Sequence, residues 1–326
     1  MSTDTNNSSA TPTVVVLQHV THPERDNQFR AIAVSSEFLK ANRKMLRIRC
    51  TQCQISLAKP LKCAKCKSVW YCSRECQKKH WSTHKPRCHE VERSSGALKF
   101  IRMFILNPLL MSFLKIGVVI DCGLNDNPRI GFDVPFGVRV DIAIEPSDVL
   151  DFAGLYLGSK SFGEKLQGMV QVNAMAQYEL TPERVDKWRE ARARHDAEGF
   201  AKDPVGLVDF IDATCTEHSG NAATVELHFP RVVLDIAKAR EPFLLVSAVT
   251  GAETRKPMSA MSCLETINMH IRADKDNQLY LRTEMTDQDK QIIRAAGRNE
   301  DTYLARLLQE KIKREHLYAD IAQLIP

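Results

Sequence analysis

The pattern of apolar and polar positions divides the chain into helical and extended segments. Residues Val138–Glu145 alternate with a period of two, which predicts a strand buried on one face. Further strands are predicted over Thr224–Phe229, Phe243–Val249 and Gln278–Met285. Helices are predicted over Thr181–Glu198, which begins with a cap and a proline, and over Met258–Ile271, Asp287–Ala296 and Asp301–Leu324. Because strands and helices mix without strict alternation, the pattern predicts an α+β domain.

The most apolar stretch is Ala97–Ile120. Its longest uncharged piece, Met103–Leu114, has twelve residues, whereas a membrane span needs about twenty. Pro108 interrupts the helical pattern because proline removes a backbone donor. We therefore expect a buried helix broken near Pro108 and no membrane segment.

The order of these patterns indicates the domain organisation. Residues 1–21 begin with a run rich in Ser, Thr and Asn and lack the features of a targeting sequence, so a disordered tail is expected. Apolar residues at roughly helical spacing predict a helical lead-in over residues 22–49. A cysteine-rich segment occupies residues 50–88. The predicted α+β domain, whose role the pattern does not reveal, covers residues 97–326.

Seven of the ten cysteines lie in the segment 50–88, in pairs with metal-ligand spacing. Structural zinc takes four thiolate or imidazole ligands, so eight ligands predict two structural zinc ions. Side chains four residues apart share a helix face, which favours two ligands from each of the last two pairs. Spacing alone permits either a sequential or an interleaved arrangement of the two sites. The eight candidate ligands are Cys50, Cys53, Cys63, Cys66, Cys72, Cys76, His84 and Cys88.

Two alternatives concern the same segment. A disulfide framework would need an oxidising compartment and an even number of cysteines, and neither a secretory signal nor an even count is present. His80 also follows Cys76 by four residues and would be the ligand in place of His84. The His84-x3-Cys88 pair favours His84.

The residues between the ligands resemble the MYND zinc finger. Its pattern, C-x2-C, C-x2-C, Y-C-x3-C-Q-x3-W-x2-H-x3-C, is filled at every position of this segment. The resemblance implies an interleaved arrangement, with Cys50, Cys53, Cys72 and Cys76 on one zinc and Cys63, Cys66, His84 and Cys88 on the other.

The resemblance also implies that Gln77 and Trp81 line a shallow groove for short proline-containing peptides. Judged from the residues alone, Trp70, Tyr71 and Trp81 are expected to form a miniature apolar core, since so short a segment has little else to bury.

Charge is unevenly distributed along the chain. Residues 43–88 contain thirteen Lys and Arg against one acid, Glu75, which leaves 32 basic and 39 acidic residues elsewhere. A basic finger is attracted to nucleic acid, but no base-reading helix with C2H2 spacing is present. Nucleic acid is therefore a possible partner that the sequence does not favour. The other cysteines, Cys122, Cys215 and Cys263, are expected to be buried thiols in a reducing, intracellular compartment, the nucleus or the cytoplasm.

No catalytic motif emerges from the sequence. The phosphate loop, the H-E-x-x-H helix and the dinucleotide fingerprint are absent, as is the Asn-His segment that SET methyltransferases associated with MYND fingers need. The acids at Asp141, Glu145, Asp148 and Asp151 are expected on a solvated face. His218 and His228 flank a Gly-Asn turn and could face each other across a hairpin, but they lack a third ligand.

We therefore expect a non-catalytic adaptor whose MYND finger binds short proline-containing peptides of partner proteins in transcriptional regulation. The alternatives are a MYND-associated lysine methyltransferase or another enzyme in the C-terminal domain, and a DNA-binding regulator. The sequence does not identify the partner or the oligomeric state.

Overall fold

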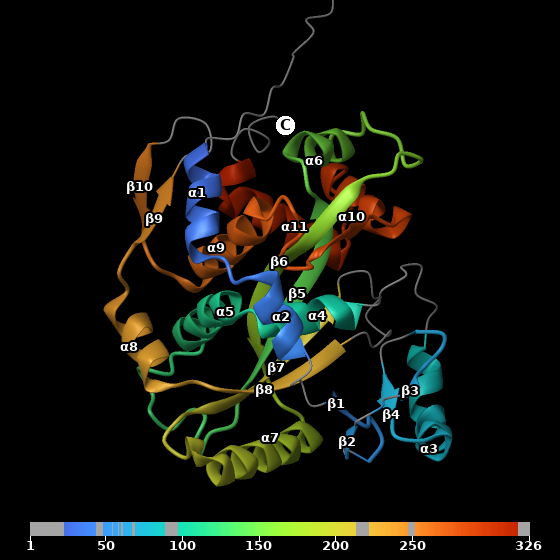
Figure 1. Cartoon of the computed structure of the whole chain (residues 1–326), viewed down its shortest axis with the longest axis vertical. Helices are drawn as coiled ribbons and strands as arrows, with labels where there is room; N and C mark the ends of the chain where they lie inside the picture. The colour runs from blue at the N-terminus through green and yellow to red at the C-terminus, as the bar shows by residue number, and fades with distance from the viewer. Residues whose placement is uncertain are drawn as a thin grey trace, which may run out of the picture.

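A five-stranded sheet forms the centre of the larger domain (Figure 1). The strand order is β11 (Arg282–Glu284), β6 (Gln167–Tyr178), β5 (Gly137–Pro146), β7 (Val205–Asp212) and β8 (Ala222–His228). The central β5 is antiparallel to β6 and parallel to β7. The computed structural model describes residues 23–43, 48–53, 55–57, 59, 61–66, 69–88, 97–212, 222–246 and 252–318. Over these residues the domain combines helices and a mixed sheet, so the predicted α+β class is confirmed.

Helices cover the sheet and complete the domain. In chain order they are α4 (Ala97–Leu106), α5 (Pro108–Asp121), α6 (Val149–Tyr156), α7 (Pro182–His195), α8 (Arg231–Ala239), α9 (Ala260–Ala273), α10 (Asp287–Gly297) and α11 (Tyr303–Arg314). A small separate hairpin pairs β9 (Phe243–Val246) with β10 (Glu253–Lys256). The short helical turns are η1 (Lys85–Arg87), η2 (Asp196–Phe200) and η3 (His316–Tyr318).

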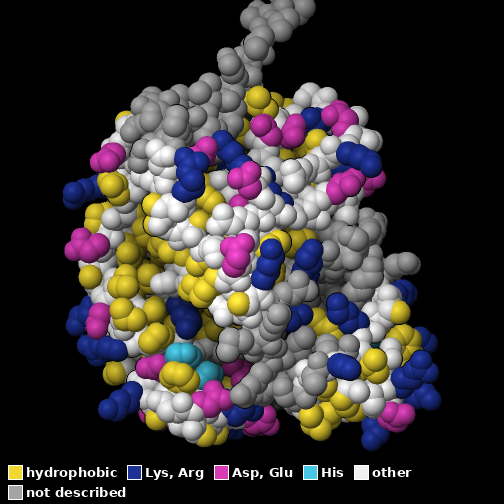
Figure 2. All heavy atoms as spheres, in the orientation of Figure 1, with side chains coloured by type: hydrophobic (Ala, Val, Ile, Leu, Met, Phe, Trp, Pro, Cys, Tyr) yellow, Lys and Arg dark blue, Asp and Glu magenta, His cyan; other side chains and the backbone are white. Residues whose placement is uncertain are grey.

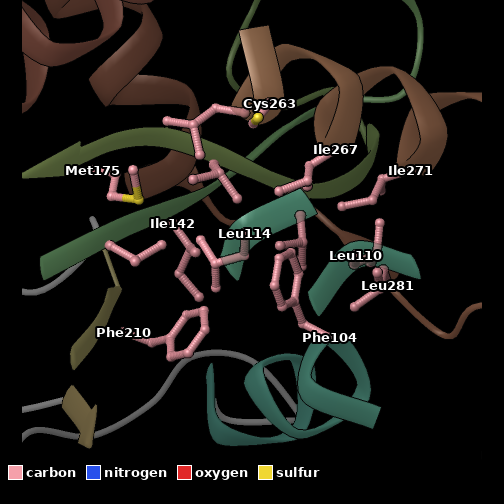
Figure 3. Packing of buried hydrophobic residues seen from close by; sticks show 14 of the residues in the cluster. Phe104, Leu110, Leu114, Ile142, Met175, Phe210, Cys263, Ile267, Ile271 and Leu281 are labelled. Carbon is pink, nitrogen blue, oxygen red and sulfur yellow. The ribbon is translucent and has the colours of Figure 1, made fainter. Parts of the chain in front are cut away.

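The large core lies between the sheet and helices α4, α5 and α9 (Figure 3). The apolar residues of β5, including Ile142, meet Phe104, Leu114 and Ile267 from the three helices. The Phe104 ring packs edge-on against Phe210 of β7, with the ring centroids 5.6 Å apart. The predicted strand over Val138–Glu145 is present as part of β5, but it is buried on both faces and not on one, because it is the central strand of the sheet.

The break between α4 and α5 follows from Asn107-Pro108. The Asn107 side chain accepts hydrogen bonds from the amides of Leu109 and Leu110, and Pro108 occupies the first turn of α5. No single helix among the described residues is long and apolar enough to cross a membrane. The pair Lys99–Leu106 and Pro108–Asp121 passes that test together but is bent by 88°.

A buried polar cluster that the sequence did not predict joins β5 to α9, α11 and η3. Lys311 of α11 donates to Glu145 of β5 at 2.6 Å, and the Tyr318 hydroxyl donates to the same carboxylate at 2.7 Å. The Arg272 guanidinium lies 3.8 Å from Glu145 and donates to the Tyr318 hydroxyl. Burial raises the pKa of Glu315, whose carboxylate accepts a hydrogen bond from Asn268. Two cations and two carboxylates thus lie together inside the fold.

This cluster overturns the expectation of a solvated acidic face. Asp141 is only 2% exposed and Glu145 only 1%. Their burial is compensated by ion pairs, Asp141 with Arg139 and Glu145 with Lys311. Only Asp148, which caps α6, and Asp151, which pairs with Lys160, lie nearer the solvent.

The helical lead-in packs on the larger domain. Helix α1 (Pro23–Ile32) places Phe29 against His270 of α9, with the ring centroids 4.9 Å apart. Helix α2 (Ser36–Arg43) lies beside α4. The predicted lead-in is therefore helical over residues 23–32 and 36–43, whereas the predicted tail of residues 1–21 lies outside the described residues.

The small N-terminal module consists of two hairpins and one helix. Strand β1 (Ile48–Arg49) pairs with β2 (Ser56–Leu57), and β3 (Leu61–Lys62) pairs with β4 (Trp70–Tyr71). Helix α3 (Arg74–His84) follows, and the module lies beside α4, at the lower right of Figure 1.

Candidate metal centre

Two hairpins and one helix position the eight candidate ligands. Cys50 and Cys53 lie in the turn after β1, and Cys63 and Cys66 in the turn after β3. The turns are closed by hydrogen bonds from the Cys50 amide to Ile55 O, at 2.9 Å, and from the Cys63 amide to Val69 O, at 3.1 Å. Each turn therefore directs two sulfur atoms to one point.

Helix α3 supplies the other ligands from its two ends. Its N-cap Ser73 accepts a hydrogen bond from the Cys76 amide at 3.3 Å, which fixes the helix start between Cys72 and Cys76. His84 closes the helix, and Cys88 follows the short turn that contains Pro86. The helix thus links one cluster at its start to a second cluster at its end.

The first cluster joins the first hairpin to the helix start. Its four Sγ atoms, from Cys50, Cys53, Cys72 and Cys76, all lie within 4.8 Å of one another. The Cys53–Cys72 and Cys72–Cys76 sulfurs are 3.6 and 3.4 Å apart. A zinc–sulfur bond of about 2.3 Å gives a tetrahedron with edges of about 3.8 Å, whereas a disulfide needs about 2.0 Å. The spacing fits a zinc ion and is too long for a disulfide.

The second cluster joins the second hairpin to the helix end. It contains Cys63, Cys66, His84 and Cys88, all buried. His84 Nε2 lies 3.5 Å from the sulfurs of both Cys63 and Cys66, and the Cys63 and Cys88 sulfurs are 3.7 Å apart. A tetrahedron with three sulfurs and one nitrogen has sulfur–nitrogen edges of about 3.6 Å. The two clusters are interleaved along the chain, the arrangement that the family resemblance implied.

His80 lies outside both clusters. Its Nδ1 atom is 3.0 Å from the Tyr71 hydroxyl, and its ring stacks on His84. Burial, then the charge of His80, lowers the pKa of His84, which favours the neutral imidazole that binds a metal. Burial and the surrounding thiolates raise the pKa of Tyr71 to about 12, so its phenol stays protonated. Tyr71 of β4 and His80 of α3 therefore pack between the two clusters without binding a metal themselves.

The three aromatic residues do not form one miniature core. Tyr71 is fully buried in the finger, but Trp70 packs against the core of the larger domain, and Trp81 is 41% exposed on α3. Gln77 lies one helical turn before Trp81 and is half-buried. Trp81 is therefore available at the surface, with the half-buried Gln77 beside it.

One contact that the sequence did not reveal joins the finger to the larger domain. The guanidinium of Arg102 on α4 lies 5.3 Å from the centre of the Trp70 ring. A basic residue on the predicted helix of residues 97–120 gives no signal of its target, because the contact depends on tertiary packing.

The other residues considered for chemistry are two histidines and three cysteines, of which Cys215 lies outside the described residues. His218 lies outside the described residues, so its approach to His228 stays a prediction. His228 Nδ1 lies 2.8 Å from an Asp203 oxygen, and its ring contacts His195 and Phe200. Cys122 and Cys263 are buried, as expected, and burial raises the pKa of both thiols to about 12. Neither is a thiolate nucleophile at neutral pH.

The fold and the two cysteine-rich clusters define the class: a two-zinc MYND finger attached to an α+β domain. The sequence pattern of the MYND finger matches residues 50–88, and the cofactors are two zinc ions. MYND fingers are non-catalytic protein-interaction modules.

The chain belongs to the family defined by a domain of unknown function (DUF8205), whose sequence model matches residues 94–318. Two curated proteins match a short segment of this chain. SET domain-containing protein 14 of Caenorhabditis elegans is 42% identical over 43 residues, which are 13% of this chain and 10% of the relative. Tudor domain-containing protein 1 of Mus musculus is 38% identical over 53 residues, 16% of this chain and 4% of the relative. The chain thus matches a tenth or less of the length of these relatives. No solved structure matches it.

Proposed function

We propose that this protein is an adaptor whose MYND finger binds a short, extended, proline-containing peptide of a partner protein. The observation that carries the proposal is the position of Trp81 and Gln77. A large aromatic ring is 41% exposed on a helix whose other face holds metal ligands, with a side-chain amide one turn away. Exposed aromatic rings beside hydrogen-bonding amides are typical of surfaces that bind proline-rich segments.

The zinc ions have a structural role in this proposal. Cys50, Cys53, Cys72 and Cys76 would hold one ion, and Cys63, Cys66, His84 and Cys88 the other. Two small hairpins bury too little apolar surface to fold alone, and a bound zinc ion supplies about 10 to 16 kcal/mol in comparable fingers. Metal binding therefore orders α3, which presents Trp81.

The remaining parts of the proposal concern organisation and context. We propose that residues 50–88 form one unit, and that the helical lead-in of residues 22–49 accompanies the α+β domain of residues 97–326, because α1 and α2 pack there. The partner is proposed to act in transcriptional regulation within the nucleus or cytoplasm. No residue receives a catalytic role.

Replacing Trp81 with alanine tests the peptide surface. The full-length, zinc-loaded protein and its Trp81→Ala variant are titrated with heptapeptides selected on the wild type from a displayed random library. We expect a loss of about thirtyfold or more in affinity, because an aromatic anchor at the centre of a contact contributes roughly 2 kcal/mol or more. Phe38→Ala is the control, since Phe38 is 45% exposed on α2, outside the finger.

The zinc content of each variant is measured alongside. Unchanged affinity of Trp81→Ala with two zinc ions retained would place the binding surface elsewhere. Affinity that falls equally in Phe38→Ala would count against a role specific to the finger.

A further inference from the structure

The outer surface of α3 carries a line of cations around Trp81. Successive residues of an α-helix are separated by about 100° around its axis. Arg74, Lys78, Trp81 and Lys85 therefore fall within a sector of about 60°, and we call these four residues the α3 stripe. All four are exposed, and the backbone of Lys85 is still helical, with φ −50° and ψ −46°.

The stripe points away from the four-cysteine cluster, whereas the Trp81 ring lies edge-on to the His84 ring of the second cluster, with the centroids 5.8 Å apart. By the same geometry Cys76 lies about 170°, and His84 about 90°, from the centre of the stripe. One zinc ion with four thiolates carries a net charge of about −2, and at the four-cysteine cluster that charge lies on the other side of the helix. The lysines of the stripe are therefore poorly placed to neutralise that cluster.

Carboxylates of the described residues neutralise the stripe only in part. Among these residues, no ion pair involves Arg74, Lys78 or Lys85. Glu75 is the only acid between residues 43 and 88. A hydrogen bond from Ser73 and the nearby charges of Lys78 and Arg74 lower the pKa of its carboxyl, so one carboxylate faces the three cations of the stripe. Figure 2 shows Lys and Arg side chains at the outer edge of the finger, at the lower right.

We propose that the peptide bound by the finger is acidic, with Asp or Glu residues on both sides of the apolar residue that contacts Trp81. This inference rests on the peptide-binding function proposed above and names the chemistry of the partner. Lys78 precedes Trp81 by about one turn and Lys85 follows it by about one turn, so carboxylates on either side of a central apolar residue meet a cation.

The length of the stripe sets the length of the peptide. Arg74 and Lys85 are eleven steps apart along the helix, or about 16 Å at 1.5 Å per residue. An extended, proline-containing chain advances about 3.1 Å per residue, so about five residues cover the stripe. Duplex DNA is the less suitable ligand, because its binding typically uses six to ten phosphate contacts and this stripe offers three cations around an aromatic ring.

Charge reversal of the stripe tests the inference. A displayed library of random heptapeptides is selected on the full-length, zinc-loaded wild type and on Lys78→Glu/Lys85→Glu. The wild type is expected to enrich Asp and Glu beside an apolar residue, and the variant to enrich Lys and Arg. A peptide selected on the wild type should bind the variant about five- to tenfold more weakly at 0.1 M salt, because exposed ion pairs are individually weak.

Two controls isolate the stripe. Lys202→Glu/Lys238→Glu changes the net charge equally at exposed positions outside the finger and should leave affinity and enrichment unchanged. High salt, about 1 M, should remove most of the difference between the wild type and the stripe variant, since exposed charges are then screened.

The outcomes separate this inference from the function on which it rests. Peptides that need Trp81 but show no excess of Asp or Glu would refute the acidic partner and leave the peptide-binding function intact. If the library yields no binder, both are refuted. If a duplex DNA of 20 base pairs binds the wild type, loses affinity in Lys78→Glu/Lys85→Glu, and no peptide is enriched, the stripe binds nucleic acid and the inference is wrong.

Discussion

Replacing Lys311 with methionine should destabilise the α+β domain by about 3 kcal/mol. The side chains of Lys311 and Glu145 are 0% and 1% exposed, and the ammonium lies 2.6 Å from the carboxylate. Methionine nearly conserves the volume, so the main effect is a buried carboxylate that loses its closest cation. Breaking such a pair costs about 3 to 5 kcal/mol. The lower end applies because the Tyr318 hydroxyl and Arg272, 3.8 Å away, still face Glu145.

Urea unfolding at pH 7 with zinc present measures this effect, followed by far-ultraviolet circular dichroism. Lys311→Met, Glu145→Gln and the double variant form a double-mutant cycle. A glutamine at position 145 still accepts the Tyr318 hydrogen bond and carries no charge, so the double variant should be less destabilised than the sum of the single variants, by about 2 kcal/mol. Lys313→Met is the matched control, because Lys313 lies on the same helix with a side chain 66% exposed. It should change stability by less than about 0.5 kcal/mol.

Two results would refute the reasoning. The first is a decrease of less than about 1 kcal/mol in the free energy of unfolding of Lys311→Met, with an unchanged slope against urea. It would mean that the Glu145 carboxylate does not need the Lys311 ammonium to stay buried. The second is a coupling energy near zero in the cycle, which would mean that Lys311 and Glu145 act independently.

Three further predictions concern the metal sites, pH and the contact between the two modules. A chelator should remove the zinc ion of the four-cysteine cluster faster than the other, because Cys53 and Cys72 are exposed whereas all ligands of the second cluster are buried. A chromogenic zinc dye measures the release, and a single rate for both ions would contradict this prediction. Burial lowers the pKa of His270 from 6.5 to about 4. Between these values the unfolded chain binds a proton that the folded state excludes, so stability falls as pH decreases, by up to about 1.4 kcal/mol per pH unit. His270→Leu should reduce this dependence of the unfolding free energy on pH, measured by urea unfolding at pH 7, 6 and 5. Any loss of zinc at low pH affects the wild type and the variant alike, so it cancels in their difference. Equal slopes in the two proteins would contradict the prediction. Trp70→Ala should keep two zinc ions but increase amide hydrogen exchange in α4, because Arg102 loses the ring beneath it; unchanged exchange would show that the contact does not hold the modules together.

The metal centre could be predicted because its signal is local. The Cys-x2-Cys pairs and the Cys72-x3-Cys76 spacing place ligands in turns and on one helix face, and such geometry depends on neighbouring residues alone. The break at Pro108 and the start of α7 after Thr181 have the same local origin. The interleaved assignment of the ligands to the two sites has no such local signal, and it came from the family resemblance.

The sheet was only partly predictable because its interior strands are buried on both faces. Strands β6 and β7 were missed, since alternation disappears when both faces are covered. Helix α7 packs Trp188 against Leu207, while Phe210 of the same strand β7 faces the large core. The predicted strand Gln278–Met285 shortens to β11, because Tyr280 has a positive φ of 58°, which interrupts the extended backbone before it.

Buried charges escape prediction for a related reason. Glu145 was expected in solvent because its partner Lys311 lies 166 residues away in the chain. Neither position indicates its partner in the sequence, and an isolated Lys or Glu is usually exposed at the surface.

The stacking of Arg102 on Trp70 has a consequence for any partner that the finger captures. In the peptide-binding function proposed above, a finger joined only by a flexible linker would let its bound peptide take many orientations relative to the larger domain, whereas this contact favours the one in which Trp70 lies beside α4. The residues that select the peptide and the residues that orient it would then be separate.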